Sequence, residues 1–465
     1  MSTAPVASRR SLFRNPNYAK LWTAATVSLF GTQVSQIAIP FIAAVLLNAS
    51  PGEVGLLTTI EFLPFLLFTL PAGVWVDRFP KKRILVIGDV GRAFMLASIP
   101  IAYALGALTI WQLYVVGFVN GLMTVFFDVA DQSYLPSILE RDDLVEGNAK
   151  LQISQSSAQI LGQPFGGEIV ALLTTPVAVL MDAVSYLGSA GLILWIRETG
   201  RRAAGALRTG PATVISEAEE LAPSPAAAAS VAVEAGAAEG DLTEGGGALA
   251  LGGMRSQIAD GLRYILGHRY LRNIAATTAT SNLFGNIAFA IFPVYAYRVL
   301  QLTPEAVGTI GGLGGAGVLL GALVANRVQA RFGLGRAIVG SAIMFGPFNL
   351  LMPLATPQVA FWFLSVSFFL SGISTVVYNV AQVSLRQAIT PDAFLGRMNA
   401  TMRFLVWGTI PVGSLIGAGL SEVIGVQGTI WVGAILSLFA FLPVFLSPVR
   451  GLRTIADAEA ETTAS

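Results

Sequence analysis

Long apolar stretches separated by short polar turns are the feature that most restricts the fold of this chain. Of its 465 residues, 54% are hydrophobic and only 12% are charged, against roughly 25% charged residues in a soluble domain. A helix of roughly 20 apolar residues can cross a bilayer because its backbone groups bond to one another. Twelve runs have this length: 21–47, 54–76, 84–106, 109–133, 148–173, 177–197, 273–299, 305–326, 335–355, 358–386, 395–420 and 428–447. The sequence therefore predicts an all-α membrane protein with twelve transmembrane helices.

One stretch of the sequence occurs twice. Residues 121–149 align without a gap with residues 372–400, and the identical pairs include Gly121 with Gly372 and Asn148 with Asn399. Each copy ends one apolar run, crosses a polar turn and starts the next run. A duplication of this kind indicates two halves with the same helix order. We therefore expect two pseudo-symmetric six-helix bundles.

The composition changes between the two halves. Residues 200–253 are mostly Ala, Gly, Glu and Ser with few large apolar side chains, which predicts a disordered cytosolic linker. Residues 254–272 place apolar side chains on one stripe, which predicts an amphipathic helix on the membrane surface. The remaining boundaries follow from the apolar runs: an N-terminal tail at 1–20, an N-terminal bundle at 21–199, a C-terminal bundle at 273–448 and a C-terminal tail at 449–465.

The basic residues indicate the orientation. If the amino end is cytosolic, all of the 28 Lys and Arg residues except Arg92 and Arg298 fall in or beside segments on that side. Basic residues gather on the cytosolic side of membrane proteins, so we expect a multi-pass protein of a bacterial-type inner (plasma) membrane with both termini cytosolic. The basic residues form no continuous patch for nucleic acid. The chain has no cysteine, so it forms no disulfide.

Charged residues within the apolar runs are candidates for proton coupling. An unpaired carboxylate in lipid costs on the order of 2 kcal/mol or more, so it must be protonated, paired or in contact with water. Glu61 could carry a proton, hydrogen-bond a neighbouring helix or bind a cationic solute. Acids and bases three residues apart share a helix face, and such a cluster could exchange partners or form a static network. The candidates are Glu61, Asp89, Arg92 and Asp128.

The embedded acids are unequally divided between the halves. The tenth run has Asn379 and Gln382 where its repeat has Asp128 and Asp131. Apart from Glu422 at the outer edge of the eleventh run, the embedded carboxylates precede the linker. We therefore expect any proton coupling to lie in the N-terminal bundle.

A charged motif, Gly73-x-x-x-Asp77-Arg78-x-x-Lys81-Lys82-Arg83, connects the second and third runs. Together with twelve runs in two halves, this motif resembles the major facilitator superfamily. The drug and siderophore exporter branch, which includes macrolide-efflux and enterobactin-exporter-like proteins, is the most similar. The resemblance to this branch rests on five sequence segments: Leu63–Phe68, Asp89–Arg92, Asp128–Pro136, Asn148–Leu151 and Asp182–Tyr186.

The resemblance implies a gate. Asp77 would lie against the start of the eleventh helix, near Gly396 to Asn399, where the helix dipole favours an anion. Arg78 would pair with an acid at the end of the fourth helix, for which Asp131 is best placed. These contacts would close the cytosolic side in an outward-facing state. The gate residues are Gly73, Asp77, Arg78, Lys81, Lys82, Arg83 and Asp131.

The resemblance also implies a central cavity, lined by the first, fourth, seventh and tenth helices. Amide side chains on these helices could face that cavity or join two helices. They are Gln33, Gln36, Asn120, Asn282, Asn286, Asn379 and Gln382. The fifth run carries an antiporter-like motif of Gly162, Pro164, Gly166 and Gly167.

These features predict a secondary transporter that rocks its two bundles and exports amphipathic molecules, such as drugs, macrolide-like compounds or siderophores, in exchange for protons. A facilitator or importer of the same fold, or a membrane sensor or scaffold, are the alternatives. The glycine run near Gly311 lacks the Gly-Lys-Ser/Thr of a nucleotide-binding loop. We expect no catalytic residues, metal or cofactor. The expected partners are a small-molecule substrate, protons and the bilayer, and we expect a monomer.

Overall fold

A computed structural model describes residues 12–139, 141–197 and 261–458. Within these ranges the chain forms helices and no strands. The predicted linker at 200–253 and the first part of the predicted surface helix lie outside the described residues, as do residues 1–11 of the N-terminal tail and residues 459–465 of the C-terminal tail.

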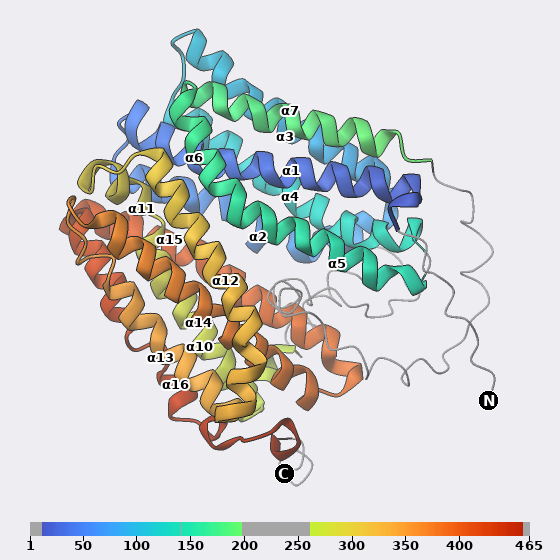
Figure 1. The fold of residues 1–465 in the computed structure, drawn as a ribbon, viewed down its shortest axis with the longest axis vertical. Helices are drawn as coiled ribbons and strands as arrows, with labels where there is room; N and C mark the ends of the chain where they lie inside the picture. The colour runs from blue at the N-terminus through green and yellow to red at the C-terminus, as the bar shows by residue number, and fades with distance from the viewer. Residues whose placement is uncertain (1–11, 140, 198–260, 459–465) are drawn as a thin grey trace.

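Helical segments of the N-terminal half form one bundle (Figure 1). Polar caps fix where several of them begin: the Ser50 hydroxyl accepts the backbone N–H of Glu53, whose carboxylate accepts the N–H of Ser50. These two reciprocal hydrogen bonds satisfy two backbone N–H groups that would otherwise have no acceptor at the start of the helix. The segments are α1 (Pro16–Phe41) with the wide turn η2 (Ile42–Leu46), α2 (Pro51–Arg78), α3 (Lys81–Ala104), α4 (Ile110–Ile138), α5 (Arg141–Ser157), η3 (Ala158–Gly162), α6 (Gln163–Leu172) and α7 (Thr175–Leu194).

The C-terminal half forms the second bundle. Its last long helix contains Gly425, whose φ of 75° and ψ of 170° are not helical, so this element consists of two helices joined at that residue. Glycine adopts this left-handed φ without a steric cost. The segments are α10 (Leu271–Phe289), α11 (Phe292–Val294), η5 (Tyr295–Val299), α12 (Pro304–Phe332), α13 (Leu334–Leu350), α14 (Ala360–Ile389), α15 (Asp392–Ser437) and α16 (Leu442–Phe445).

The predicted all-α membrane fold is confirmed. In the described ranges, nine segments are long and apolar enough to cross a membrane. One of them contains the two helices of α15 that meet at Gly425. The fifth predicted span corresponds to α5, η3 and α6 together, and the ninth to the short α13. Each predicted apolar run thus has a helical counterpart.

The duplicated stretch forms the same contact in each half. Gly121 on α4 packs against the backbone of α2 at Glu61, and Gly372 on α14 packs against the backbone of α12 at Gly314. A side chain at either glycine would overlap a carbonyl oxygen of the neighbouring helix. The repeat therefore preserves a close helix crossing that depends on a small residue.

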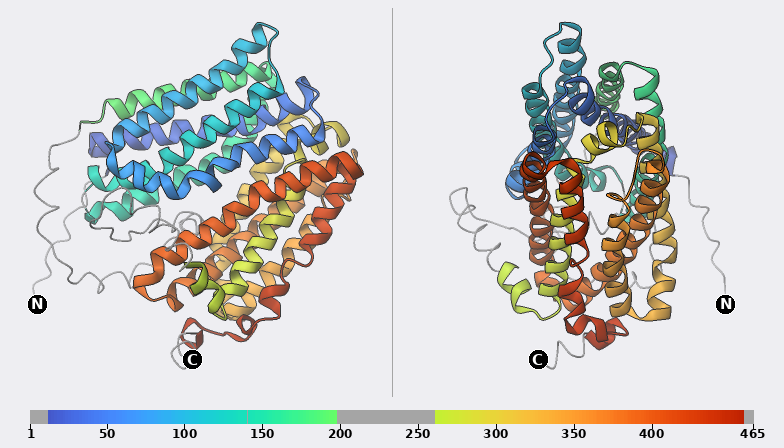
Figure 2. Two further views of the ribbon diagram at one scale, coloured as in Figure 1. Left: turned by 180° about the vertical axis from the view of Figure 1, so that it is seen from behind. Right: turned by 90° about the vertical axis from the view of Figure 1, so that its left-hand side faces the viewer.

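The two bundles are joined at one end and diverge at the other, as Figures 1 and 2 show from opposite sides. We call the end at which α1 begins and α14 ends the tail end, and the end at which α2 and α12 begin the loop end. At the loop end α2 lies beside α15, and α6 lies beside α12. The tail ends of the bundles lie apart.

Glycines allow close contact between the bundles at the loop end. A Cβ atom on Gly55 would lie 2.8 Å from the Cβ of Ala418, and one on Gly308 would overlap the carbonyl oxygen of Gln163. Toward the middle of α2, the rings of Phe65 and Trp407 stack with centroids 5.0 Å apart. Contact between α2 and α15 thus extends from the loop end to about Phe65.

A short helical segment precedes the C-terminal bundle. Residues 261–267 are helical, and Ile265 is fully buried against the bundle. The Nδ1 atom of His268 accepts the backbone N–H of Tyr270 at 3.2 Å. Burial, aided by the neighbouring charge of Arg269, lowers the pKa of His268. The neutral imidazole can therefore accept this hydrogen bond at neutral pH.

Candidate functional site

The lysines of the charged motif bind helix ends. The Lys81 ammonium donates to the carbonyl of Val76 at 3.2 Å, and the Lys82 ammonium donates to the carbonyls of Leu194 and Ile196 at 2.9 and 2.7 Å. These carbonyls lie at the ends of α2 and α7, where intrahelical donors are lacking and a cation is favourable. Both lysines therefore stabilise helix termini at the tail end.

The gate residues lie at the tail end, where the two bundles are apart. Asp77 lies on the last turn of α2, and Gly73 has no atom within 4 Å of the position that a Cβ would occupy. Arg78 is exposed, and in the described part of the chain no ion pair joins it to Asp131. The predicted contacts belong to a state in which the tail ends meet, and the side chain of Asp77 lies outside the described part of the structure.

A buried ion pair lies in the N-terminal bundle. Asp89 and Arg92, on successive turns of α3, are 2.5 Å apart, and their side chains are 0% and 5% exposed. The Arg92 guanidinium lies over the rings of Phe127 and Tyr186, 4.2 and 4.3 Å from their centroids. Ring faces attract a cation, so α4 and α7 both hold this arginine.

A second acid on α7 extends this arrangement. Asp182 is 1% exposed and accepts hydrogen bonds from Ser35 on α1 at 2.5 Å and from Ser185 at 3.2 Å. The hydroxyls of Tyr186 and Thr32 are 2.8 Å apart. We call Thr32, Ser35, Asp89, Arg92, Asp182, Ser185 and Tyr186 the polar network. It joins α1, α3 and α7 through buried polar groups.

Glu61 lies on α2 where this helix crosses α4. Its backbone packs against Gly121 of α4, and its Cβ would lie 3.8 Å from a Cβ on Gly117. Among the described residues it has neither a hydrogen bond nor an ion pair. By contrast, Asp128 and Asp131 each have an interaction partner. Glu61 therefore differs from the other embedded acids.

The amides of the N-terminal bundle have different environments. Gln33 is 5% exposed, Gln36 is exposed, and Asn120 is partly buried. The side-chain oxygens of Gln33 and Asn120 accept no hydrogen bond within the described structure. The structure thus places these residues on α1 and α4 but does not gather them at one point.

The glycines of the antiporter-like motif make close helix contacts. Gly162, at the end of the wide turn η3, packs against the side chain of Gln33, and Gly166 packs against the backbone of α1 at Gln33 and Val34. Gly167 touches the start of α12, and Pro164 touches Gly312. The motif therefore forms part of the contact between the two bundles.

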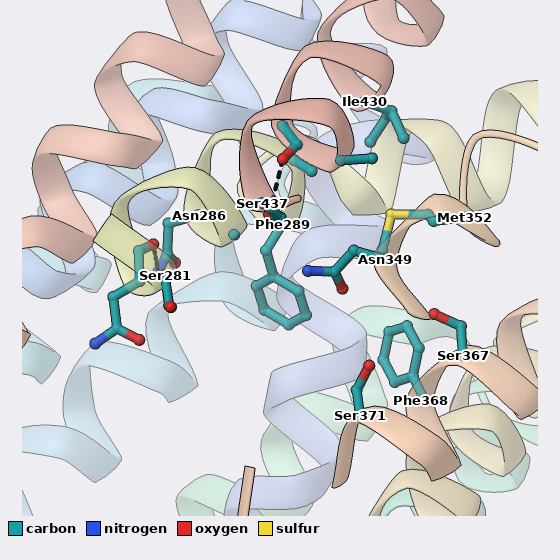
Figure 3. Close-up of a pocket in the computed structure, with 15 residues that line it drawn as sticks. Ser281, Asn286, Phe289, Asn349, Met352, Ser367, Phe368, Ser371, Ile430 and Ser437 are labelled. Atoms are coloured by element: carbon teal, nitrogen blue, oxygen red, sulfur yellow. Dashed lines mark hydrogen bonds between the residues drawn. The ribbon is translucent and has the colours of Figure 1, made fainter. Parts of the chain in front are cut away.

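A cavity of about 310 Å³ lies in the C-terminal bundle. Phe289 on α10, Asn349 on α13 and Phe368 on α14 approach it from three helices (Figure 3). The predicted residues Asn282 and Asn286 also line it. We call it the asparagine cavity.

A second cavity of about 380 Å³ shares part of this lining. Asn282, Asn379 and Gln382 line it, together with Arg386 and Trp407. Because Trp407 stacks on Phe65 of α2, this cavity borders the N-terminal bundle. We call it the arginine cavity. Three of the seven predicted amides thus share one site.

A carboxylate joins the bundles at the loop end. Glu422 on α15 accepts hydrogen bonds at 2.7 Å from the Ser50 hydroxyl and from the backbone N–H of Gly52, at the start of α2. Nearby, the Nε of Arg298 donates to the carbonyl of Ala44 at 2.6 Å. An anion at a helix N-terminus is favourable because the helix dipole is positive there.

Four functional candidates became apparent only in the structure. Asp182 joins Asp89 and Arg92, and the helical spacing of Asp182, Ser185, Tyr186 and Ser189 already predicts a polar face. Arg386 and Arg298 enter the sequence-based prediction only through the distribution of charge. A cation inside an apolar run was the available signal for Arg386. No sequence signal indicated the contact of Glu422 with α2.

A family model described as Major Facilitator Superfamily matches residues 21–243 and 274–464. A bacterial homologue of the iron transporter ferroportin, crystallised in an inward-facing state, is similar with a TM-score of 0.68. The match covers 94% of this chain and 99% of that chain at 14% identity.

Several curated proteins are similar in sequence. Macrolide efflux protein A of Streptococcus pyogenes is 21% identical over 412 residues, which are 88% of this chain and 90% of that protein. The multidrug efflux pump Tap of Mycobacterium bovis is 24% identical over 432 residues, 90% of each chain. The transporter YfiS of Bacillus subtilis is 26% identical over 188 residues, 40% of this chain and 44% of YfiS, so that match spans less than half of the relative.

Proposed function

The chain belongs to the major facilitator superfamily, and we propose that this transporter exports amphipathic small molecules across the plasma membrane in exchange for protons. Relatives named as macrolide and multidrug efflux proteins support the direction and the class of solute. Drugs, macrolide-like compounds and siderophores are the proposed range.

Alternating closure of the two ends is the proposed mechanism. The loop ends are packed together, and the tail ends lie apart. With the tail end in the cytosol, as the distribution of basic residues predicts, the described conformation would accept solute from inside. Closing the tail end would bring Asp77 and Arg78 to the predicted gate contacts and open the loop end.

The isolation of Glu61 is the observation that carries the proposal of proton coupling. Asp89 is paired with Arg92, and Asp182 is held by two serines, whereas Glu61 has no such partner in the described structure. An embedded carboxylate without a partner must bind a proton or reach water. Protonation and release at Glu61 would therefore occur without breaking an ion pair.

Transport in vesicles tests this function. The purified full chain is reconstituted, the vesicle lumen is made acidic, and the uptake of erythromycin and of 2-naphthoate is measured against protein-free vesicles. Exchange for protons predicts protein-dependent solute accumulation in the acidic lumen and simultaneous proton loss. Equal solute flux with and without the pH gradient would instead support a facilitator.

A substitution identifies the coupling residue. Glu61→Gln should abolish proton movement while solute-for-solute exchange continues, because glutamine keeps the shape but binds no proton. The matched control is Glu146→Gln, which breaks an ion pair with Lys150 outside the proposed path and should change neither activity. Unaltered coupling in Glu61→Gln would exclude this residue as the carrier.

A further inference from the structure

The C-terminal bundle contains a buried cation that has no carboxylate partner among the described residues. Arg386 on α14 is 7% exposed, and its one hydrogen bond in the described structure is to the side-chain oxygen of Asn399, at 3.5 Å. Its Nε donates to no acceptor there. Arg92 is the contrasting case, because it is equally buried but has both an acid and two ring faces.

Among the described residues, the surroundings of Arg386 contain no compensating charge. None of the residues that line the arginine cavity is acidic. At the positions where the N-terminal repeat has Asp128 and Asp131, this half has Asn379 and Gln382. A buried guanidinium is costly unless an anion pairs with it. The described part of the chain supplies no such anion in this conformation.

The cavity around Arg386 is larger than a small inorganic ion requires, and part of its wall is apolar. Its volume is about 380 Å³, and Phe345, Met402, Trp407 and Ile410 provide apolar walls. Ligand sites typically combine apolar walls with a few polar groups that fix the orientation. An anionic group near Arg386 would leave the apolar part of a solute against these side chains.

We propose that the arginine cavity binds amphipathic organic anions, with Arg386 pairing with their carboxylate or similarly charged group. This inference rests on the proposed transport function and names its substrate class. A guanidinium binds a carboxylate through two parallel hydrogen bonds, and the free Nε leaves one donor for this purpose. The Asn399 oxygen holds another part of the guanidinium.

Equilibrium binding of two solutes of equal shape tests the proposal. Radiolabelled 2-naphthoate and its neutral amide, 2-naphthamide, are titrated onto the full chain in lipid nanodiscs. The wild type should bind the acid about tenfold more tightly, a ratio that one charge-assisted contact can give. Arg386→Gln should remove this preference, and Arg386→Lys should retain part of it because lysine keeps the charge but not the planar donors.

Controls separate the site from general effects of charge. Arg327→Gln changes an exposed arginine that bonds within α12, and it should leave the preference intact. Thermal unfolding tests the unpaired charge itself. Without ligand, Arg386→Met should have a higher unfolding temperature than the wild type. Added 2-naphthoate should raise the unfolding temperature of the wild type but not that of Arg386→Met. An absent preference in the wild type, or an unchanged one in Arg386→Gln, would overturn the proposal.

Two further outcomes would also overturn it. If chloride or inorganic phosphate displaces 2-naphthoate at equal concentration, the site is one for a small inorganic anion. If Arg386→Gln changes only the distance between the bundles, Arg386 pairs with a carboxylate of the N-terminal bundle on closure. Binding needs no ion gradient, so this test is independent of the flux measurement. If the acid binds more tightly than the amide in an Arg386-dependent way, but vesicles show no proton exchange, the coupling mechanism is refuted and this inference stands.

Discussion

Arg92 and Arg386 show two ways of burying a cation in one chain. Arg92 has a carboxylate at 2.5 Å and two aromatic faces, so its charge is compensated within the fold. Within the described ranges, the side chain of Arg386 bonds only to the neutral amide of Asn399. Buried charges are found where they have a partner or a functional role. Arg92 therefore contributes to the structure of its bundle, and Arg386 is available to a ligand.

We expect Asp89→Asn to destabilise the protein by about 3 kcal/mol, because it leaves the Arg92 guanidinium buried without a counter-ion. The double variant Asp89→Asn with Arg92→Met should recover most of this loss, since it removes the charge as well. Denaturant unfolding of the purified protein measures both values. A double variant no more stable than the single variant would show that the ion pair is not the source of the loss.

The sequence predicted individual residues less well than it predicted helices. Asp89 and Arg92 are three residues apart, so their pairing could be predicted from spacing. Their link to Tyr186 on α7 depends on the rotation of that helix, which apolar run lengths do not determine. Likewise, Asn282, Asn379 and Gln382 line one cavity, whereas Gln36 is exposed and Gln33 is buried against Gly162.

Among the helices, α2 and α15 lie side by side, and each carries a carboxylate that could bind the N-terminus of the other. At the loop end, Glu422 of α15 binds the N-terminus of α2. At the tail end, Asp77 of α2 is predicted to bind the N-terminus of α15. Each carboxylate would bind a helix dipole of the opposite bundle, and the described side chains form the loop-end contact.

Glu422→Gln should therefore weaken closure at the loop end. An exposed charge at a helix N-terminus contributes roughly 0.3–1 kcal/mol, so we expect the open population to rise about twofold to fivefold. Distances between spin labels across the loop end measure this population. Glu53→Gln is the control, because the carboxylate of Glu53 accepts the backbone N–H of Ser50 within the capping box of α2 and not a donor of α15. The same shift in both variants would contradict a specific contact by Glu422.

The contact between α6 and α12 depends on glycine. We expect Gly308→Ala to separate these helices, because the added methyl would overlap the carbonyl oxygen of Gln163. Overpacking of this kind costs about 1–3 kcal/mol. Gly340→Ala on α13, where no atom lies within 4 Å of the added carbon, should have no effect. The same label distances at the loop end compare the two variants, and equal distances would contradict this account.

At the scale of the whole molecule, the duplication and the twelve apolar runs predicted the architecture because backbone hydrogen bonding in lipid permits few alternatives. The sequence could not predict which end is closed. Both closures use the same helices, and they differ by a tilt between the bundles. The contacts that distinguish them, such as Phe65 with Trp407, join residues far apart in the chain.

The linker gives a prediction that separates a transporter from a sensor or scaffold. Deleting residues 205–250 should leave solute flux unchanged, because the bundles contact each other through α2, α6, α12 and α15. Flux in vesicles measures this effect, and the amount of inserted protein serves as the control. Loss of flux at equal insertion would indicate that the linker has a role in the activity.

Reciprocal closure of the two ends is the central claim, and pairs of spin labels test it most directly. The chain contains no cysteine, so single cysteines can be introduced without a background. One pair replaces the exposed Phe79 and Phe332 at the tail end, and the other replaces Leu105 and Val423 at the loop end. Both distances are measured in lipid nanodiscs at acidic and alkaline pH. We predict that one distance shortens whenever the other lengthens. Two distances that stay constant, or that change in the same direction, would contradict the account.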